Sequence, residues 1–221
     1  MKKMGIVTIG QAPRTDLVPE IKTILGENIE VIEKGALDGL TLKEVEALYP
    51  AKDDEVLVTR MANGTEVKVA ERLVFPLLKK QVHKLEQEGI KVIFLACTGE
   101  FPQFESESLV IRPQRVLHHV VSSIAKDLTL GVIVPDERQI NSAKERWASA
   151  AAKVVVESGS PYGKIEKIEN AARNLASSFV DIVVMDCMGY TLSMKNIVMS
   201  IVDKPVILAR SIVAKVVSEL L

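Results

Sequence analysis

Residues 92–99 read VIFLACTG, in which four apolar residues and one small residue precede Cys97-Thr98-Gly99. A short run of apolar, β-branched and aromatic residues that ends in glycine predicts a buried strand followed by a sharp turn. Residues 182–189 read IVVMDCMG and repeat the pattern, with an acidic residue before Cys187-Met188-Gly189. The chain therefore carries the same strand and turn twice, once in each half.

The beginnings of the two halves also correspond. Residues 5–9 read GIVTI and residues 131–135 read GVIVP, and each stretch leads into a polar loop and a helical pattern. Because both pairs occur in the same order, we interpret the chain as two related lobes. We expect residues 1–111 and 209–221 to form the first lobe and residues 112–208 the second, with no flexible linker between them.

The alternation of short apolar runs and helical patterns sets the fold class. Strands are predicted at residues 4–9, 29–32, 56–61, 66–69, 91–96, 128–134, 153–157, 181–186 and 205–208. Helices are predicted at residues 16–25, 42–48, 70–88, 114–126, 139–151, 165–177, 193–201 and 209–220. This order predicts an α/β fold of mostly parallel sheets flanked by helices, and Asn63-Gly64 adds one tight antiparallel hairpin.

Composition and charge narrow the class of partner. The chain of 221 residues is 48% apolar but only 4% aromatic, as expected of parallel strands covered by helices. Its 28 basic and 29 acidic residues give a net charge of −1, which offers no electrostatic attraction to nucleic acid or to an anionic membrane. We therefore expect a small-molecule ligand, and neither nucleic acid nor a membrane as partner.

No signal-peptide pattern opens the sequence, and no apolar run approaches the about 20 residues that a membrane span needs. A cytoplasmic location is therefore expected. Two cysteines are too few for a disulfide framework, so both are expected to be thiols.

Cys97 and Cys187 are the candidate catalytic residues. Each is expected at the carboxyl end of a buried strand, where parallel sheets bind ligands, and at the start of a turn into a helix, whose dipole would favour a thiolate. Glycine two residues later lets a ligand approach the backbone amides. Two such thiols suit proton transfer at a carbon next to a carboxylate, which requires no cofactor. The alternative is that both are small, buried strand-end residues.

Other candidates lie in loops at strand ends or at the start of a helix. Arg14 can clamp a substrate carboxylate and Gln11 can orient it; alternatively, Arg14 is a surface arginine near a helix cap at Thr15 or Asp16. No third ligand accompanies His118 and His119, so no metal is expected. The predicted substrate-binding residues are Gly10, Gln11, Arg14, Thr59, Thr98, Gly99, Arg115, Met188 and Gly189.

Four stretches together resemble the AroM family, and the resemblance covers essentially the whole chain. They are Thr8-Ile9-Gly10-Gln11-Ala12-Pro13-Arg14, Arg112-Pro113-Gln114-Arg115, Gly131-Val132-Ile133-Val134-Pro135 and Asp186-Cys187-Met188-Gly189. AroM proteins are similar to the aspartate/glutamate racemase superfamily, which includes hydantoin racemases and maleate isomerase. The resemblance implies two pseudo-symmetric α/β lobes with a cofactor-free site in the cleft between them. It is also the basis for expecting a homodimer.

The resemblance also implies site residues. One cysteine from each lobe would take part, and this pattern falls on Cys97 with Thr98 and on Cys187. The main hypothesis is therefore a cofactor-independent racemase or isomerase of a small carboxylate-bearing molecule. In the amino-acid racemases Thr and His usually follow the second cysteine, where this chain has Met188 and Gly189. That difference favours an alternative, a carboxylate-binding or sensing protein, and a third hypothesis is a lyase or hydrolase with one nucleophilic cysteine.

Overall fold

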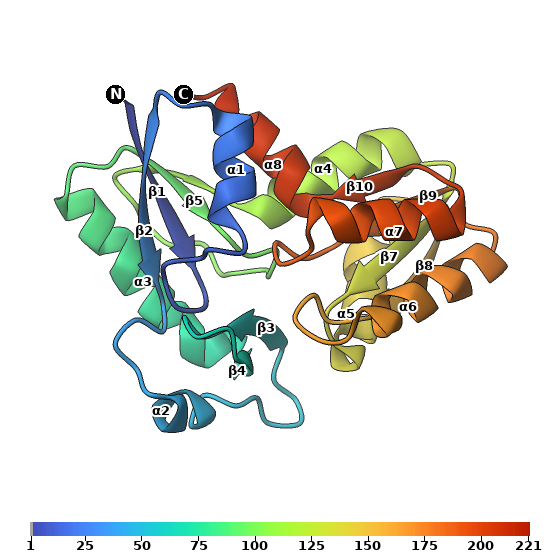
Figure 1. Ribbon diagram of the computed structural model, residues 1–221, viewed down its shortest axis with the longest axis horizontal. Coiled ribbons are helices and arrows are strands. Elements are labelled where there is room, and N and C mark those ends of the chain that lie inside the picture. The colour runs from blue at the N-terminus through green and yellow to red at the C-terminus, as the bar shows by residue number, and fades with distance from the viewer. Residues whose placement is uncertain (1) are drawn as a thin grey trace. The chain divides into compact units, whose positions relative to one another are not determined.

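The structure is a computed structural model that describes residues 2–221 (Figure 1), so only residue 1 of the expected first lobe lies outside it. The chain forms two compact units. The first runs to Gln114 and takes up Ala214–Leu221 at the end of the chain, and the second comprises Arg115–Val213.

Strands and helices alternate through most of the chain. The strands are β1 (Lys2–Thr8), β2 (Ile29–Gly35), β3 (Val56–Arg60), β4 (Glu66–Ala70), β5 (Val92–Leu95), β6 (Leu109–Ile111), β7 (Thr129–Val134), β8 (Lys153–Ser158), β9 (Ile182–Met185) and β10 (Val206–Leu208). The helices are α1 (Val18–Leu25), α2 (Leu42–Glu46), α3 (Glu71–Gln87), α4 (Pro113–Ala125), the short 3₁₀ helix η1 (Glu137–Gln139), α5 (Ile140–Trp147), α6 (Ile165–Ser177), α7 (Leu192–Val202) and α8 (Ala209–Ser218).

The two units have the same sheet topology. The first sheet has the strand order β2-β1-β5-β6 and the second β10-β9-β7-β8, and all pairs within them are parallel. Read from the second strand of each unit, both sheets follow the order 2-1-3-4. The α/β class with two mostly parallel sheets is therefore confirmed.

The strand register matches between the units as well. Gly5 of β1 lies opposite Ile93 of β5, and Gly131 of β7 lies opposite Val183 of β9. These are the partners expected if residues 5–9 correspond to 131–135 and residues 92–99 to 182–189. The internal repeat seen in the sequence is thus a repeat of topology and register.

Each central strand is buried on both faces. In β1, Val7 packs in a core with Leu85 of α3 and Ile93 of β5, while Met4 and Ile6, on the opposite face by strand alternation, are also buried. In the second unit, Ile133 of β7 packs with residues of α6 and α7, and Figure 1 shows these two helices side by side along the second sheet. Burial on both faces explains why these strands are almost continuously apolar.

The predicted hairpin is confirmed. Strands β3 and β4 pair antiparallel, and Gly64 in the turn has a positive φ of 92°, which favours glycine. The Asn63 side chain accepts a hydrogen bond from the amide of Thr65 at 3.0 Å and stabilises the turn.

Some elements differ from the prediction. Strand β6 was not predicted, because only three residues pair and Leu109 is 51% exposed, so the segment lacks the buried apolar pattern of the other strands. Helix α1 begins at Val18 after Leu17, so neither Thr15 nor Asp16 is its N-cap.

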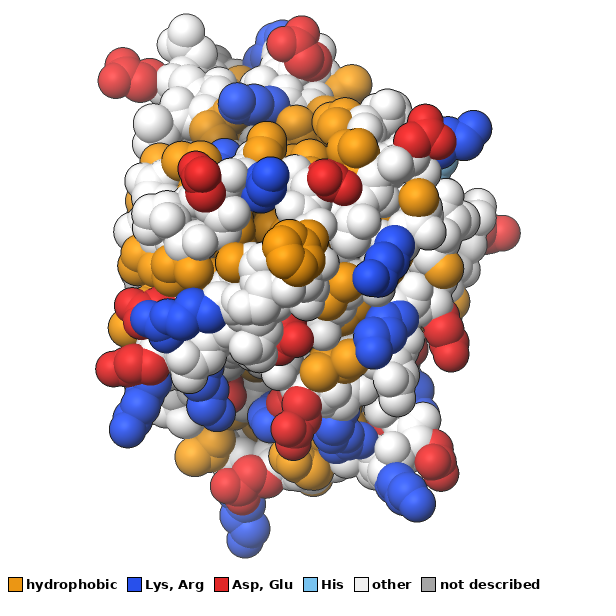
Figure 2. All heavy atoms as spheres, turned by 90° about the vertical axis from the view of Figure 1, so that its right-hand side faces the viewer, with side chains coloured by type: hydrophobic (Ala, Val, Ile, Leu, Met, Phe, Trp, Pro, Cys, Tyr) orange, Lys and Arg blue, Asp and Glu red, His pale blue; other side chains and the backbone are white. Residues whose placement is uncertain are grey.

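Among the described residues, no helix is long and apolar enough to cross a membrane. On the face drawn in Figure 2, basic and acidic side chains are interspersed and neither sign gathers in one place.

Candidate functional site

Cys97 lies directly beyond β5, in the first unit, and its side chain is buried with 8% exposure. Its Sγ accepts a hydrogen bond from the amide of Gly99 at 3.3 Å. A side chain at Gly99 would come within 2.9 Å of Leu57 on β3, so glycine allows the turn to pack against the hairpin. Thr98, between them, is buried as well.

The segment after Cys97 differs from the expectation. No helix occurs in residues 96–108 of the structure, so the predicted helix dipole next to Cys97 is wrong. Instead, Phe101 stacks on Phe75 of α3 with ring centroids 6.0 Å apart, and Arg112 donates to the carbonyls of Phe101 and Pro102 at 3.3 Å each. These contacts fix the segment without helical hydrogen bonds. At Cys97 the amide of Gly99, and no helix N-terminus, therefore donates to the sulfur.

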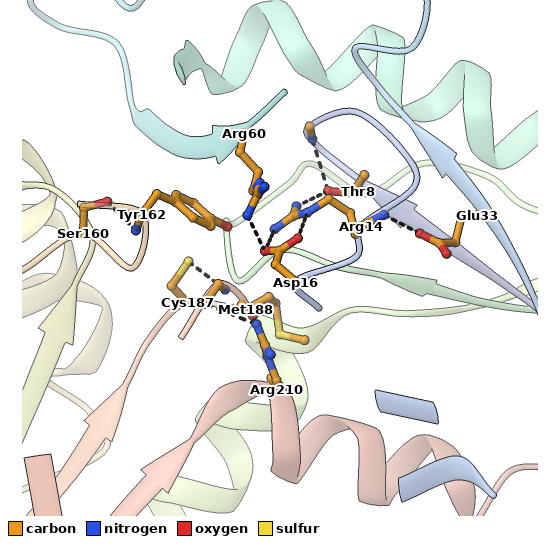
Figure 3. Close-up of polar contacts among 12 residues, drawn as sticks. Thr8, Arg14, Asp16, Glu33, Arg60, Ser160, Tyr162, Cys187, Met188 and Arg210 are labelled. Carbon is orange, nitrogen blue, oxygen red and sulfur yellow. Dashed lines mark hydrogen bonds and ion pairs between the residues drawn. The ribbon is translucent and has the colours of Figure 1, made fainter. Parts of the chain in front are cut away.

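Arg14, in the loop after β1, is buried at 3% exposure rather than lying on the surface. Its Nε and Nη2 donate to the two carboxylate oxygens of Asp16 at 2.9 and 2.8 Å, and its Nη1 donates to the hydroxyl of Thr8 at 2.7 Å (Figure 3). Arg60 of β3 approaches the same carboxylate at 3.9 Å, and its side chain is 24% exposed. Two arginines thus share one aspartate at the carboxyl edge of the first sheet.

The charge state of Asp16 follows from these neighbours. Burial alone would raise the pKa of this carboxyl, but the hydrogen bond and attraction from Arg14, with Arg60, outweigh it and hold the pKa below its ordinary value of 3.8. Asp16 is therefore an anion near neutral pH and fixes the guanidinium of Arg14.

Gln11 joins three backbone segments. Its amide nitrogen donates to the carbonyls of Leu37 and Leu40 at 3.1 and 2.8 Å, and its oxygen accepts from the amide of Ala62 at 2.9 Å. The side chain therefore ties the loop after β1 to the loop after β2 and to the hairpin.

Gly10 and Thr59 lie against each other. A Cβ at Gly10 would clash with the Thr59 hydroxyl and lie 2.5 Å from the carbonyl oxygen of Arg60. The Thr59 hydroxyl is buried and has no hydrogen-bond partner among residues 2–221. Such a group is a candidate to bind a ligand, since a buried hydroxyl without a partner is costly.

Cys187 lies beyond β9, in the second unit, and is half-buried. Its Sγ accepts a hydrogen bond from the amide of Gly189 at 3.3 Å, the same contact as that between Gly99 and Cys97. Helix α7 follows after its N-cap Thr191, whose side chain accepts from Met194. Each cysteine therefore follows the third strand of its sheet, and its sulfur accepts a hydrogen bond from the amide of the glycine two residues later.

Arg210, in the first turn of α8, also contacts the Cys187 turn and was missed by the sequence analysis. It is fully buried, and its Nε and Nη2 donate to the carbonyls of Met188 and Gly189 at 3.0 and 3.1 Å (Figure 3). The signal that could have found it is an arginine in the first turn of a helix after a buried strand, where the helix dipole disfavours a cation.

Asp186, the residue before Cys187, is held by α5. Its Oδ2 accepts hydrogen bonds from the indole of Trp147 at 2.8 Å and from Arg146 at 3.0 Å. The side chain of Arg146 is 11% exposed, whereas that of Asp186 is 0%. The negative charge next to Cys187 is thus paired.

Two tyrosines surround the same turn. A Cβ at Gly189 would lie 2.5 Å from the hydroxyl of Tyr162 and 2.7 Å from Pro161, so the loop after β8 lies directly on the glycine. Tyr190 is fully buried and donates to the carbonyl of Gly159 at 2.8 Å, which places it in the core. Tyr162 was not identified from the sequence.

The structure groups the predicted site residues by unit. In the first unit, Gly10 contacts Thr59, and Gly99 contacts Cys97; in the second, Met188 and Gly189 form the turn after Cys187. Arg115, on α4 in the second unit, is exposed. Within residues 2–221, no three His, Cys, Asp or Glu side chains are grouped so that they could hold a metal ion.

Comparison with solved structures defines the class of fold. An allantoin racemase from Klebsiella pneumoniae matches 100% of this chain and 87% of its own length, with a TM-score of 0.63 and 13% identity. The aspartate racemase of Picrophilus torridus matches 100% of this chain and 94% of its own length, with a TM-score of 0.64 and 13% identity. A Nocardia farcinica maleate cis-trans isomerase matches 100% of this chain and 93% of its own length, with a TM-score of 0.63 and 14% identity. The chain therefore has the two-lobed α/β fold of these racemases and this isomerase.

The family is narrower than the fold. The AroM family model, described as AroM protein, matches residues 4–221. The protein belongs to the AroM family, as the sequence resemblance indicated. No curated protein matches the sequence significantly.

Proposed function

We propose that this AroM protein is a cofactor-independent racemase or isomerase of a small carboxylate-bearing molecule, with Cys97 and Cys187 as the opposed acid and base. One observation carries the proposal: each sulfur follows the third strand of an equivalent sheet and accepts an amide N–H from the glycine two residues later. Two equivalent thiols are what proton transfer on both faces of one carbon requires. The racemase-like fold supports the same class of chemistry.

The reaction moves one proton and changes no oxidation state. One thiolate removes the proton from the carbon next to the substrate carboxylate, and the electron pair of the broken C–H bond delocalises into that carboxylate. The opposite thiol then protonates the other face of the carbon. The two sulfurs exchange protonation states in each turnover, so the enzyme works in both directions.

The glycine amides favour the reactive form of each cysteine. A hydrogen bond to sulfur is stronger when the sulfur is an anion, so the Gly99 and Gly189 amides stabilise the thiolates relative to the thiols. Each amide acts as a fixed donor that needs no rearrangement during the reaction.

The first unit offers groups that can hold the substrate carboxylate. Arg60 is partly exposed beside the Arg14–Asp16 pair, and the buried Thr59 hydroxyl has no hydrogen-bond partner among the described residues. In this proposal Arg14 holds the loop and the guanidinium of Arg60 attracts the carboxylate, with Gly10 and Thr98 lining the same edge.

The test follows the substrate carbon directly. The protein is incubated in D₂O with single enantiomers of small amino and hydroxy acids, and ¹H NMR records deuterium incorporation next to the carboxylate while chiral chromatography records inversion. We expect inversion of at least one acid, its loss in C97S and in C187S, and its retention in the surface variant R173K. Inversion that survives in either Ser variant would rule out the two-cysteine mechanism.

A non-catalytic carboxylate-binding protein is the second candidate. It is favoured by the buried, apolar Met188, whose side chain cannot relay protons next to Cys187, and by the pairing of Arg14 with Asp16. This candidate predicts no deuterium incorporation with any acid, but a rise in melting temperature with the bound acid that C97S and C187S retain and R60M loses.

A further inference from the structure

The guanidinium of Arg210 and the sulfur of Cys187 are joined through a single peptide group. Arg210 Nε donates to the carbonyl oxygen of Met188 at 3.0 Å. The nitrogen of that same peptide group belongs to Gly189, and its N–H donates to Cys187 Sγ at 3.3 Å. The hydrogen bonds therefore run from a fixed cation, across one planar amide, to the thiol (Figure 3).

This arrangement makes the Gly189 amide a stronger donor. A cation bound to the carbonyl oxygen draws electron density through the amide, and hydrogen bonds in such a chain strengthen one another. A stronger donor stabilises a sulfur anion more than a neutral thiol. Because Arg210 is fully buried, its charge is poorly screened by solvent.

We propose that Arg210 is a positioning residue that favours the thiolate form of Cys187 through the Met188–Gly189 peptide group. The inference rests on the proposed function, in which Cys187 acts as acid and base. In this role Arg210 acts through the peptide group whose N–H donates to the sulfur.

The other charged and titratable groups of the second unit around this turn do not supply the same effect. Asp186 is negative and opposes a neighbouring thiolate, while Arg146 compensates that carboxylate. Tyr162 lies on Gly189, and burial, together with the charges of Cys187 and Asp186, raises the pKa of Tyr190, so that its phenol remains neutral. Arg210 is the cation bonded to the peptide group itself, at a helix start where the dipole disfavours it.

The test measures the thiol and not the enzyme activity. The full chain is alkylated with iodoacetamide over a pH series, and mass spectrometry gives a separate rate for Cys187 and Cys97. The variants are R210M and R210K, with R173M and R173K as matched controls, because Arg173 is an exposed arginine of the same unit that pairs with Glu169.

In R210M we expect the midpoint of the Cys187 profile to rise by about one pH unit, with a roughly tenfold slower reaction near neutral pH. The plateau rate at high pH should stay within the range of the controls, because the thiolate itself is unchanged. R210K keeps the charge but cannot form both bonds of the guanidinium fork, so its midpoint should rise less. The Cys97 profile should not move.

An unchanged Cys187 midpoint in R210M overturns the proposal, as does a change confined to the plateau rate, which would report only altered access to the sulfur. Should R210M fail to fold, R210K carries the test, and a midpoint equal to that of R173K overturns it. Failure of the proposed function gives a different result from failure of this inference. In that case the wild-type protein would exchange no substrate proton, but substitution of Arg210 would still shift the alkylation midpoint of Cys187.

Discussion

The indole nitrogen of Trp147 donates a hydrogen bond to the carboxylate of Asp186 at 2.8 Å, and both side chains are buried. Trp147 is the last residue of α5, and Asp186 directly follows β9 and precedes Cys187. The contact therefore ties the end of a helix to the strand end that presents the candidate catalytic sulfur.

Replacing Trp147 with Phe should destabilise the protein by about 1–3 kcal/mol, because the buried carboxylate loses a donor that Phe cannot replace. Urea unfolding of W147F, D186A and the double variant measures the effect and isolates the pairwise term, because each single substitution removes the hydrogen bond. We expect a coupling energy of about 1 kcal/mol between the two positions. Additive effects of the two substitutions would show that the hydrogen bond contributes no stability.

The Arg14–Asp16 pair should make stability depend on acid pH. The pKa of Asp16 is lowered in the folded state, so its contribution is complete above the ordinary value of 3.8 and is lost as the pH falls through the lower folded value. D16N should cost about 2 kcal/mol near neutral pH, and the difference from wild type should shrink below about pH 4. Chemical unfolding over a pH series checks this, with the exposed Asp127 changed to Asn as the control. A difference that stays constant down to strongly acid pH would contradict the lowered pKa.

The fold could be read from the sequence because the information is local. A run such as residues 92–96 is apolar at every position, as a strand buried on both faces is expected to be. Gly5 and Gly131 hold equivalent places in the two sheets, and both allow a helix leucine, Leu85 or Leu175, to lie close to the sheet. Strand β6 was not predicted, because it has only three residues and one of them is exposed.

The site was less predictable because its polar contacts join residues far apart in the sequence. The Cys-x-Gly turns were visible, since glycine and sulfur are two residues apart in each. Arg210 was not, because its partners lie 21 and 22 residues away, and its place in the first turn of a helix does not by itself show what it contacts. The expected helix after Cys97 was wrong because Phe101 and Arg112 stabilise an irregular segment through tertiary contacts.

Gly10 should tolerate no side chain. A Cβ there would lie 2.5 Å from the carbonyl oxygen of Arg60, and backbone cannot move away as a side chain can. We expect G10A to lose about 1–3 kcal/mol of stability and to displace the hairpin from the loop after β1. G163A is the matched control, because the nearest atom to its Cβ is 3.6 Å away, and its effect should stay within about 0.5 kcal/mol. Equal stabilities of the two variants, measured by urea unfolding, would contradict the close approach.

Tyr190 should make the protein sensitive to alkali. Burial, with the nearby charges of Cys187 and Asp186, raises the pKa of its phenol well above 10.0, while in the unfolded chain the phenol ionises near its ordinary value. The stabilisation is therefore complete below about pH 10 and is lost as the pH rises further, because ionisation then favours the unfolded state. Y190F should cost about 1 kcal/mol near neutral pH through the lost hydrogen bond to Gly159, but should lose less stability than wild type between about pH 10 and 11. Y49F, at an exposed tyrosine, should follow the wild-type curve. Parallel curves for Y190F and wild type at high pH would mean that Tyr190 ionises in the folded protein as easily as in the unfolded chain, and that its environment is more polar than the structure shows.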